Sequence, residues 1–375
     1  MTTMRITFYG EGLHGGGAAR VMSVLLNAWA ERGETVNLLT MDDGSATPNY
    51  TLHPAITHRC LDIERSSSNP IVGLLATYRR VRILRKAILE TKPDVVISFL
   101  SRLNVTTVLA MKPYNIPVLV SERTDPAQRS IGRVWEYLRN KTYAEADCVV
   151  MQTERSRHYF SDKIQKRIQV IANPLTIPPE AAMPRQESNS EEKRIMALGS
   201  LRSEKGFDLL INAFAKSANQ HPEWTLNIWG EGGLRETLEA QVRSLGMEGR
   251  IHLPGQTRQP FEKLRESDIF VLSSWVEGFP NALLEAMAMG LAVISFDCPS
   301  GPSELIRPDY DGILLPPKDE EALTKALDTL MGDVKLRRQL ASHAPEVRER
   351  YSTETVLAKW DAEIQKAIMN RGKRT

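Results

Sequence analysis

Short apolar runs alternate with helix-length segments along most of this chain, and this alternation restricts the possible folds more than any other feature. The first run, residues 5–10, precedes a helical pattern over residues 18–32. Gly33 ends that pattern, and a second apolar run covers residues 36–41. Apolar runs without polar alternation are typical of parallel strands buried on both faces. The opening therefore predicts a β-α-β unit.

The alternation then continues and repeats. In the first half, further predicted strands cover residues 95–100, 117–122, 148–153 and 168–173. In the second half, they cover residues 194–199, 225–230, 251–255, 269–274, 292–297 and 311–316, with helices such as 207–219 and 234–245 between them. Between the halves, residues 173–194 contain four prolines and a polar run that no core element would contain. We place a domain boundary there.

These patterns predict an α/β protein of two doubly wound, Rossmann-like domains that face each other across a cleft. The first domain is expected over residues 1–180 and the second over residues 187–351. A helical pattern over residues 352–375 is expected to join the first domain. In open α/β sheets ligands bind beyond the carboxyl ends of the strands, so motifs at those ends matter most.

Composition limits the protein's surroundings. With 375 residues, 42% hydrophobic and 25% charged, the chain is globular and not disordered. Its three cysteines form no CxxC pair or Cys/His cluster, so we expect a reducing cytoplasm, with neither a disulfide framework nor a metal site. The start lacks the apolar core of a signal peptide, and no stretch reaches the roughly 20 apolar residues of a membrane span, so any membrane association is expected to be peripheral.

Three motifs follow predicted strands. Gly15, Gly16 and Gly17 precede the first helix, where absent Cβ atoms and free N–H groups favour a close anionic ligand. A tight turn is the alternative, and we interpret the adjacent His14 as a solvated loop residue. In the second half, the Lys205 ammonium would neutralise the charge of a diphosphate, unless the segment is a solvated turn. The guanidinium of Arg202, three residues earlier, would bind the diphosphate through two N–H groups at once.

The third motif contains two glutamates, Glu277 in a Gly/Pro loop and Glu285 two turns into the following helix. A helix rises about 1.5 Å per residue, so both carboxylates can reach one ligand. A carboxylate among Ala, Leu and Met is costly to bury unless it accepts hydrogen bonds, and ribose hydroxyls would donate them. A helix-surface carboxylate is the alternative for Glu285.

Together these motifs, in this order along nearly the whole chain, resemble the retaining glycosyltransferases of family 4, which have the GT-B fold. The resemblance is closest to the bacterial branch that builds lipid-linked or surface polysaccharide, as judged by residues 121–126 and 299–302. It implies transfer of a hexose-type sugar from a nucleotide diphosphate sugar, expected to be a UDP-sugar, with retained configuration. It implies no cofactor and no metal, because cations of the protein assist departure of the diphosphate.

The resemblance also implies roles for individual residues. Glu277 would contact the donor sugar and stabilise positive charge at its anomeric carbon, Glu285 would hold the ribose, and Lys205 would neutralise the leaving group. The loops that contain Glu231 and Gly255 would receive the base. Backbone groups near the sugar and the diphosphate would come from Gly15 to Gly17 and from Gly278, Phe279, Pro280 and Asn281.

The chain departs from the family pattern at two places. Ser200 stands where an arginine is usual, so Arg202 is the candidate substitute. Ser121-Glu122-Arg123 stands where many relatives have a histidine, so Glu122 or Arg123 is expected to face the acceptor as a catalytic residue. No carboxylate is obviously placed as a nucleophile, which favours front-face departure, in which the leaving phosphate takes the acceptor proton.

The acceptor side is expected in the first half, where 24 Lys and Arg stand against 17 Asp and Glu over residues 1–185; over residues 186–375 the counts are 24 and 29. A helical pattern over residues 70–89 concentrates five cations, and a second basic segment adds Trp135. Both suit an anionic membrane surface or acceptor phosphates, with a solvated helix face as the alternative. The cations are Arg79, Arg80, Arg82, Arg85 and Lys86.

We therefore expect a peripheral enzyme on the cytoplasmic face of the inner membrane, with a polyprenyl-diphosphate-linked glycan acceptor and no nucleic-acid partner. Two alternatives remain open: a nucleotide-sugar epimerase or donor hydrolase of the same fold, and a catalytically inactive nucleotide-binding protein. A dehydrogenase is disfavoured by the contiguous glycines and by the absence of an acidic residue at the end of the second strand.

Overall fold

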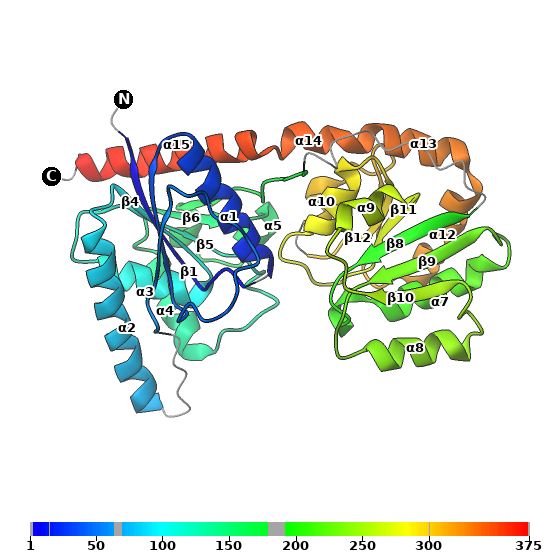
Figure 1. The fold of residues 1–375 in the computed structure, drawn as a ribbon, viewed down its shortest axis with the longest axis horizontal. Helices are drawn as coiled ribbons and strands as arrows, with labels where there is room; N and C mark the ends of the chain where they lie inside the picture. The colour runs from blue at the N-terminus through cyan, green and yellow to red at the C-terminus, as the bar shows by residue number, and fades with distance from the viewer. Residues whose placement is uncertain (1–2, 15, 64–69, 179–191, 300, 374–375) are drawn as a thin grey trace. The chain divides into compact units, whose positions relative to one another are not determined.

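The computed structural model describes residues 3–14, 16–63, 70–178, 192–299 and 301–373. The chain divides into two compact units: unit 1 comprises Met1–Pro174 and Thr353–Thr375, and unit 2 comprises Leu175–Ser352. Each unit contains one parallel sheet wrapped by helices (Figure 1). The predicted class of two Rossmann-like α/β domains is confirmed, whereas the predicted cleft between them stays a prediction.

Unit 1 has a seven-stranded sheet in the order β3-β2-β1-β4-β5-β6-β7. Its strands are β1 Arg5–Gly10, β2 Thr35–Thr40, β3 Thr57–Cys60, β4 Val95–Phe99, β5 Val118–Ser121, β6 Cys148–Met151 and β7 Ile168–Val170. Its helices are α1 Gly16–Glu31, α2 Pro70–Glu90, α3 Ser101–Met111, α4 Arg133–Tyr143, α5 Glu154–Arg157, α6 Asp162–Gln165 and α15 Thr353–Gly372.

Unit 1 has a hydrophobic core on each face of its sheet. Successive strand side chains point to opposite faces, so Phe8 packs in one core with α1 and α15, and Tyr9 packs in the other with α2 and α3. The rings of Trp29 and Trp360 meet edge to face at 6.4 Å, and Trp29 Nε1 donates to Asp361 at 2.8 Å. The C-terminal helix is therefore part of the core of unit 1.

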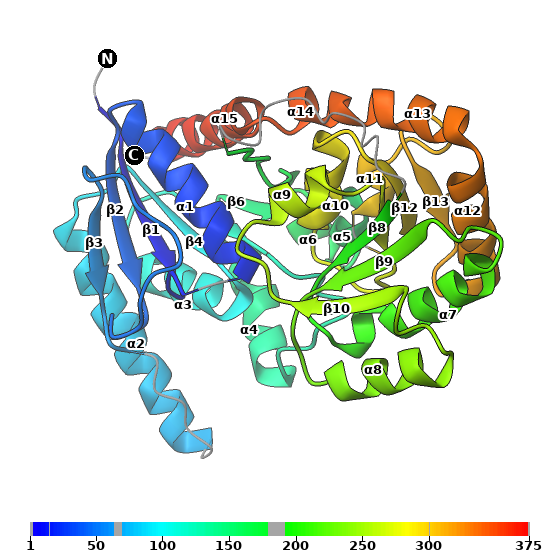
Figure 2. The same ribbon diagram turned by 45° about the vertical axis from the view of Figure 1, so that its right-hand side comes forward.

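Unit 2 has a six-stranded parallel sheet in the order β10-β9-β8-β11-β12-β13 (Figure 2). Its strands are β8 Lys193–Leu198, β9 Trp224–Trp229, β10 Ile251–Gly255, β11 Ile269–Leu272, β12 Ala292–Phe296 and β13 Ile313–Leu315. Its helices are α7 Phe207–Ala218, α8 Arg235–Ser244, α9 Pro260–Arg265, α10 Asn281–Ala288, α11 Pro302–Leu305, α12 Glu320–Gly332, α13 Val334–His343 and α14 Val347–Arg350.

Each sheet has one point where the strand order reverses. In unit 1 this switch point lies between β1 and β4, and in unit 2 it lies between β8 and β11. The loops that follow these strands diverge, which leaves room for a ligand at the carboxyl edge of the sheet. None of the helices in the described ranges combines the length and the apolar composition that crossing a membrane requires.

Candidate functional site

In unit 2, the loop after β8 and the loop after β11 hold each other at the switch point. The Ser273 hydroxyl donates to the Lys205 carbonyl at 2.8 Å, and the Trp275 N–H donates to the Glu204 carbonyl at 3.0 Å. Gly206 has a φ of +62°, and a Cβ there would lie 2.2 Å from the Ser273 carbonyl oxygen. Only glycine fits this close approach, which gives a structural reason for the glycine directly after Lys205.

These joined loops bring Lys205 and Glu277 together. Lys205 Nζ donates to Glu277 Oε1 at 2.6 Å, and the two side chains are only 18% and 11% exposed. The sequence predicted a role for each residue but not their ion pair. The pair places one cation and one carboxylate where a ligand carrying both phosphates and hydroxyls would need them.

Glu285 lies in the second turn of α10 and is 5% exposed. The alternative of a helix-surface carboxylate is therefore wrong, because the helix buries this side chain. The preceding loop is held on both sides: Phe279 is buried with its ring 6.2 Å from Tyr351, and a Cβ at Gly301 would lie 2.4 Å from Pro280. Gly278 and Asn281 are half-buried beside them. The ribose contact of Glu285 stays a prediction.

Of the other predicted donor residues of unit 2, two are exposed and one, Gly255, is buried. Arg202 is exposed in the loop after β8. Glu231 accepts from the Arg235 guanidinium at 2.7 and 2.9 Å, and these hydrogen bonds hold the pKa of Glu231 below its usual range. Gly255 has a φ of +95°, and a Cβ there would lie 3.2 Å from Glu231 Oε1. Binding of the base by these loops stays a prediction.

In unit 1, a cavity of about 300 Å³ lies at the switch point. It is lined by Gly10, Glu11, Gly12, His14, Ala18, Ala19, Met22, Phe99 and Leu100. Gly16 and Gly17 form the first turn of α1 beside it, while Gly15 lies outside the described residues. The glycine motif thus borders a cavity built from the ends of β1 and β4.

His14 is an exposed loop residue, as we expected, but its Nε2 also makes a hydrogen-bond contact with Asp42. Asp42 is buried, and its other carboxylate oxygen accepts from Thr40 at 2.7 Å. His14 and Asp42 lie 28 positions apart, so the sequence does not reveal this contact. In the described ranges, no three His, Cys, Asp or Glu side chains gather as a metal ion would require.

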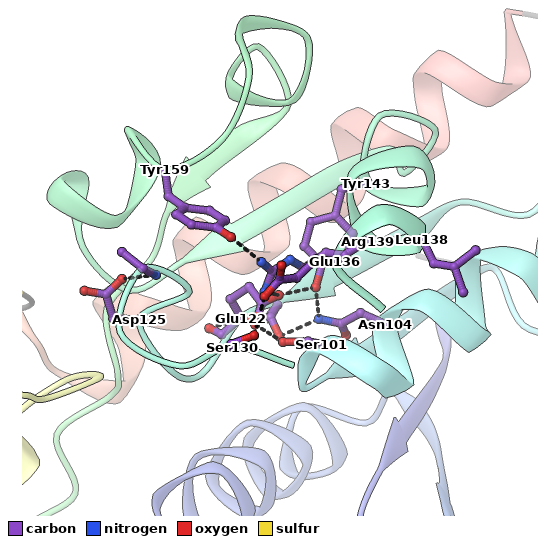
Figure 3. Close-up of polar contacts among 12 residues, drawn as sticks. Ser101, Asn104, Glu122, Asp125, Ser130, Glu136, Leu138, Arg139, Tyr143 and Tyr159 are labelled. Carbon is purple, nitrogen blue, oxygen red and sulfur yellow. Dashed lines mark hydrogen bonds and ion pairs between the residues drawn. The ribbon is translucent and has the colours of Figure 1, made fainter. Parts of the chain in front are cut away.

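The expectation that Glu122 faces an acceptor is wrong, because its carboxylate lies inside unit 1. Figure 3 shows Ser101, Tyr143 and Arg139 around it. Glu122 accepts from the hydroxyls of Tyr143 at 2.5 Å and Ser101 at 2.7 Å, and Arg139 Nη1 lies 3.8 Å away. Burial raises the pKa of Glu122, against the opposing effect of Arg139. The residue joins β5 to α3 and α4.

Arg123 is also buried, which corrects the expectation that it faces the acceptor. Its guanidinium carbon lies 3.6 Å from the centre of the Phe99 ring, and Nη1 donates to Asn173 at 2.8 Å. Burial lowers the pKa of Arg123 to about 9. Because Phe99 lines the cavity of unit 1, Arg123 supports the cavity wall.

The basic residues of α2 divide into two groups. Arg80 Nε donates to the Ile63 carbonyl and Arg85 Nε to the Ala110 carbonyl, both at 2.9 Å, so these two residues anchor the helix to unit 1. Their place on the acceptor or membrane side stays a prediction. The remaining cations, Arg79, Arg82 and Lys86, are exposed.

The second predicted acceptor-side segment lies on α4. Trp135 is half-buried there, and the Arg102 guanidinium lies 5.5 Å from its ring centre. The nearby Val134 and Tyr137 are exposed.

Comparison with known families identifies the class that this fold and these motifs define. Residues 16–174 match the family model described as glycosyl transferase 4-like domain, and residues 180–347 match the model described as glycosyl transferases group 1. The chain therefore belongs to the two-domain glycosyltransferases of the GT-B class, as its sequence motifs indicated.

Relatives in bacteria extend over nearly the whole chain. An undecaprenol-linked glycan alpha-1,4-N-acetyl-D-galactosaminyltransferase of Campylobacter jejuni is 26% identical, covering 95% of this chain and 97% of the relative. The lipopolysaccharide 1,6-galactosyltransferase of Salmonella typhimurium is 25% identical, covering 90% of this chain and 92% of the relative.

Solved structures support the fold. The lipopolysaccharide outer core galactosyltransferase WaaB has a TM-score of 0.76 at 22% identity, covering 97% of this chain and 99% of that chain. The Anabaena protein HepE, solved in complex with UDP, has a TM-score of 0.77 at 18% identity, covering 97% of this chain and 100% of that chain. At these identities the likeness concerns the fold alone.

Proposed function

We propose that this glycosyltransferase moves a hexose-type sugar from a UDP-sugar to a lipid-linked glycan acceptor, with retained anomeric configuration, in bacterial polysaccharide synthesis. The observation that carries this proposal is the Lys205–Glu277 pair at the switch point of unit 2. It lies in the part of the chain that matches the glycosyl transferases group 1 model. The undecaprenol-linked acceptor in the name of the C. jejuni relative supports the acceptor class.

In the proposed mechanism, the donor replaces the ion pair with contacts of its own. The Lys205 ammonium turns to the diphosphate and neutralises the charge that develops as it leaves. The Glu277 carboxylate, released from Lys205, accepts from donor-sugar hydroxyls and stabilises positive charge at the anomeric carbon. Because both groups are largely shielded from water, their electrostatic effect on the transition state is strong. Glu285 holds the ribose, and Lys205 makes a metal unnecessary.

Retention is proposed to follow the front-face route. The bond from the anomeric carbon to the phosphate oxygen breaks while the acceptor oxygen bonds to the same face of the sugar. The acceptor hydroxyl gives its proton to the leaving phosphate oxygen, so no protein nucleophile is needed.

The acceptor is proposed to approach with the enzyme resting peripherally on the cytoplasmic face of the inner membrane. The exposed cations Arg79, Arg82 and Lys86 would attract anionic lipid or the acceptor diphosphate. The exposed Tyr137 on α4 would enter the interface. In both views α2 extends past the sheet of unit 1 (Figures 1 and 2).

A panel of nucleotide sugars tests the donor. A ligand at 100 times its Kd should stabilise the protein by about 2.7 kcal/mol, which a thermal-shift assay detects. The best donor is then incubated with undecaprenyl-diphosphate-linked glycans, and product stereochemistry is read by NMR. UDP release that is independent of acceptor would indicate a hydrolase, a changed donor sugar an epimerase, and binding without turnover an inactive protein.

A further inference from the structure

The cavity of unit 1 has a histidine in its wall that is oriented by a chain of hydrogen bonds. His58 Nε2 lies 3.0 Å from the Thr40 hydroxyl, which donates to Asp42 Oδ1 at 2.7 Å. Asp42 Oδ2 contacts His14 Nε2. The loop after β1 and strands β2 and β3 each contribute to this chain, and His14 is the member that reaches the cavity.

The chain of hydrogen bonds fixes which nitrogen of His14 is free. The Thr40 hydroxyl has one proton and gives it to Asp42, so His58 must be the donor to Thr40. The Asp42 carboxylate only accepts, so His14 Nε2 must carry a proton and donate it. In the neutral imidazole, His14 Nδ1 then presents a lone pair, and it has no hydrogen-bond partner among the described residues. The side chain of His14 is 37% exposed.

The backbone around the cavity is shaped to allow this contact. A Cβ on Gly12 would lie 2.6 Å from Asp42 Oδ2 and 2.8 Å from His14 Nε2, so any larger residue would separate the two side chains. On the opposite wall, Leu100 has a φ of +76°. Such backbone is strained in a residue other than glycine, and strain of this kind clusters at ligand sites.

The lining of the cavity favours a neutral ligand over an anionic one. No Lys or Arg is among its described lining residues, and its charged member is the Glu11 carboxylate. A lone pair on His14 and a carboxylate on Glu11 both accept hydrogen bonds, while Met22, Phe99 and Leu100 offer apolar surface. About 300 Å³ is at the small end of the range for ligand pockets.

We infer that this cavity binds a single neutral sugar ring, and that His14 Nδ1 accepts a hydrogen bond from one of its hydroxyls. A pyranose has hydroxyl donors for His14 and Glu11 and C–H faces for the apolar wall. Asp42 acts as the positioning residue for His14. The inference rests on the proposed function for the origin of the ring, which belongs to either the acceptor glycan or the donor.

Binding is tested by saturation-transfer NMR on the full-length protein with the methyl glycosides of N-acetylgalactosamine, galactose and glucose. Wild-type protein is expected to transfer saturation to at least one of them. The signal should be lost in His14→Ala and reduced in Gly12→Ala, which keeps both side chains but blocks their contact. The matched control is His221→Ala, because His221 pairs with Asp328 at 2.9 Å on unit 2. It should behave as wild type.

Kinetics with the donor and acceptor that give turnover distinguish the two sources of the ring. His14→Ala should raise one KM roughly threefold to tenfold, the range for one neutral hydrogen bond. A rise in acceptor KM assigns the ring to the acceptor, and a rise in donor KM assigns it to the donor. No saturation transfer in wild type, or the same transfer in His14→Ala, overturns the inference. Absence of turnover in wild type refutes the proposed function instead, and the NMR result still decides the cavity.

Discussion

Two ion pairs lie near the carboxyl edges of the two sheets, and they are built differently. Glu122 and Arg139 in unit 1 are each 1% exposed at the side chain and 3.8 Å apart, with hydroxyl groups around the carboxylate. Lys205 and Glu277 in unit 2 touch at 2.6 Å and keep part of their surface in solvent. The first pair is enclosed by its own unit, whereas the second can exchange its contact for a ligand.

The difference shows that a charged residue after a strand can serve either the packing of its unit or the binding of a ligand. A buried pair is costly to desolvate and is retained because its neighbours satisfy it, so it fixes the positions of elements. A partly exposed pair in a ligand-binding loop can be opened by a ligand. We therefore expect substitutions of the two pairs to affect different measurements.

The largest expected effect is on the stability of unit 1. Glu122→Ala leaves Arg139 buried without its carboxylate and should lower the free energy of unfolding by about 3–5 kcal/mol. Urea or thermal unfolding measures this. Unchanged stability together with a raised acceptor KM would return Glu122 to the acceptor side and break the comparison.

The conservative variant Glu122→Gln sharpens the same test through pH. Burial raises the pKa of Glu122 above its ordinary 4.5, so the folded protein holds this proton more tightly than the unfolded chain. The resulting stabilisation is fully present below the ordinary value and is lost as pH rises through the folded value. The amide of Glu122→Gln cannot lose a proton. The stability of this variant relative to wild type should therefore increase as the pH rises from 4.5 through the folded-state pKa of Glu122, as urea unfolding at each pH measures.

In unit 2 the expected loss is catalytic. Glu277→Ala removes stabilisation of the transition state and should lower kcat by roughly 10²–10³-fold, while UDP still stabilises the protein against heat. The matched control is Glu321→Ala, which breaks an exposed Lys–Glu pair at 2.7 Å. It should leave kcat unchanged. A fall in stability without a change in turnover would make this pair structural as well.

Disturbing the contact between the loops after β8 and β11 should have an effect of intermediate size. Gly206→Ala places a Cβ 2.2 Å from the Ser273 carbonyl oxygen at a positive φ, and should cost about 1–3 kcal/mol of stability and weaken UDP binding. Gly233→Ala is the control, since a Cβ there meets no atom within 4 Å. Equal effects of the two variants in thermal-shift assays would contradict the close approach.

The smallest effect is expected for the exposed cations of α2. Arg79→Glu or Lys86→Glu should weaken binding to vesicles that contain anionic lipid by at least about 1 kcal/mol each, and less at high salt. Lys325→Glu, on an exposed helix face of unit 2, should have no such effect. Sedimentation with vesicles measures the binding, and equal losses for all three variants would point to net charge alone.

Apolar periodicity made most of the fold predictable, and its absence explains what was missed. β3 reads Thr-His-Arg-Cys, and three of its four residues are exposed at the sheet edge, so no apolar run marks it. Glycines and charged residues in the loops after predicted strands indicated the candidate sites, because packing in the core does not require these residue types there. Contacts between distant residues were not predictable: Lys205 and Glu277 lie 72 positions apart, and nothing local in Glu122 reveals its burial against Tyr143.

The return of the chain to unit 1 has a consequence for the order of folding during synthesis. Val356, Leu357, Trp360 and Ile364 of α15 belong to the same hydrophobic core as Phe8 of the first strand. A ribosome finishes all of unit 2 before it makes these residues. Unit 2 can therefore fold while the earlier-made unit 1 still exposes one apolar face, and that face needs protection until translation ends.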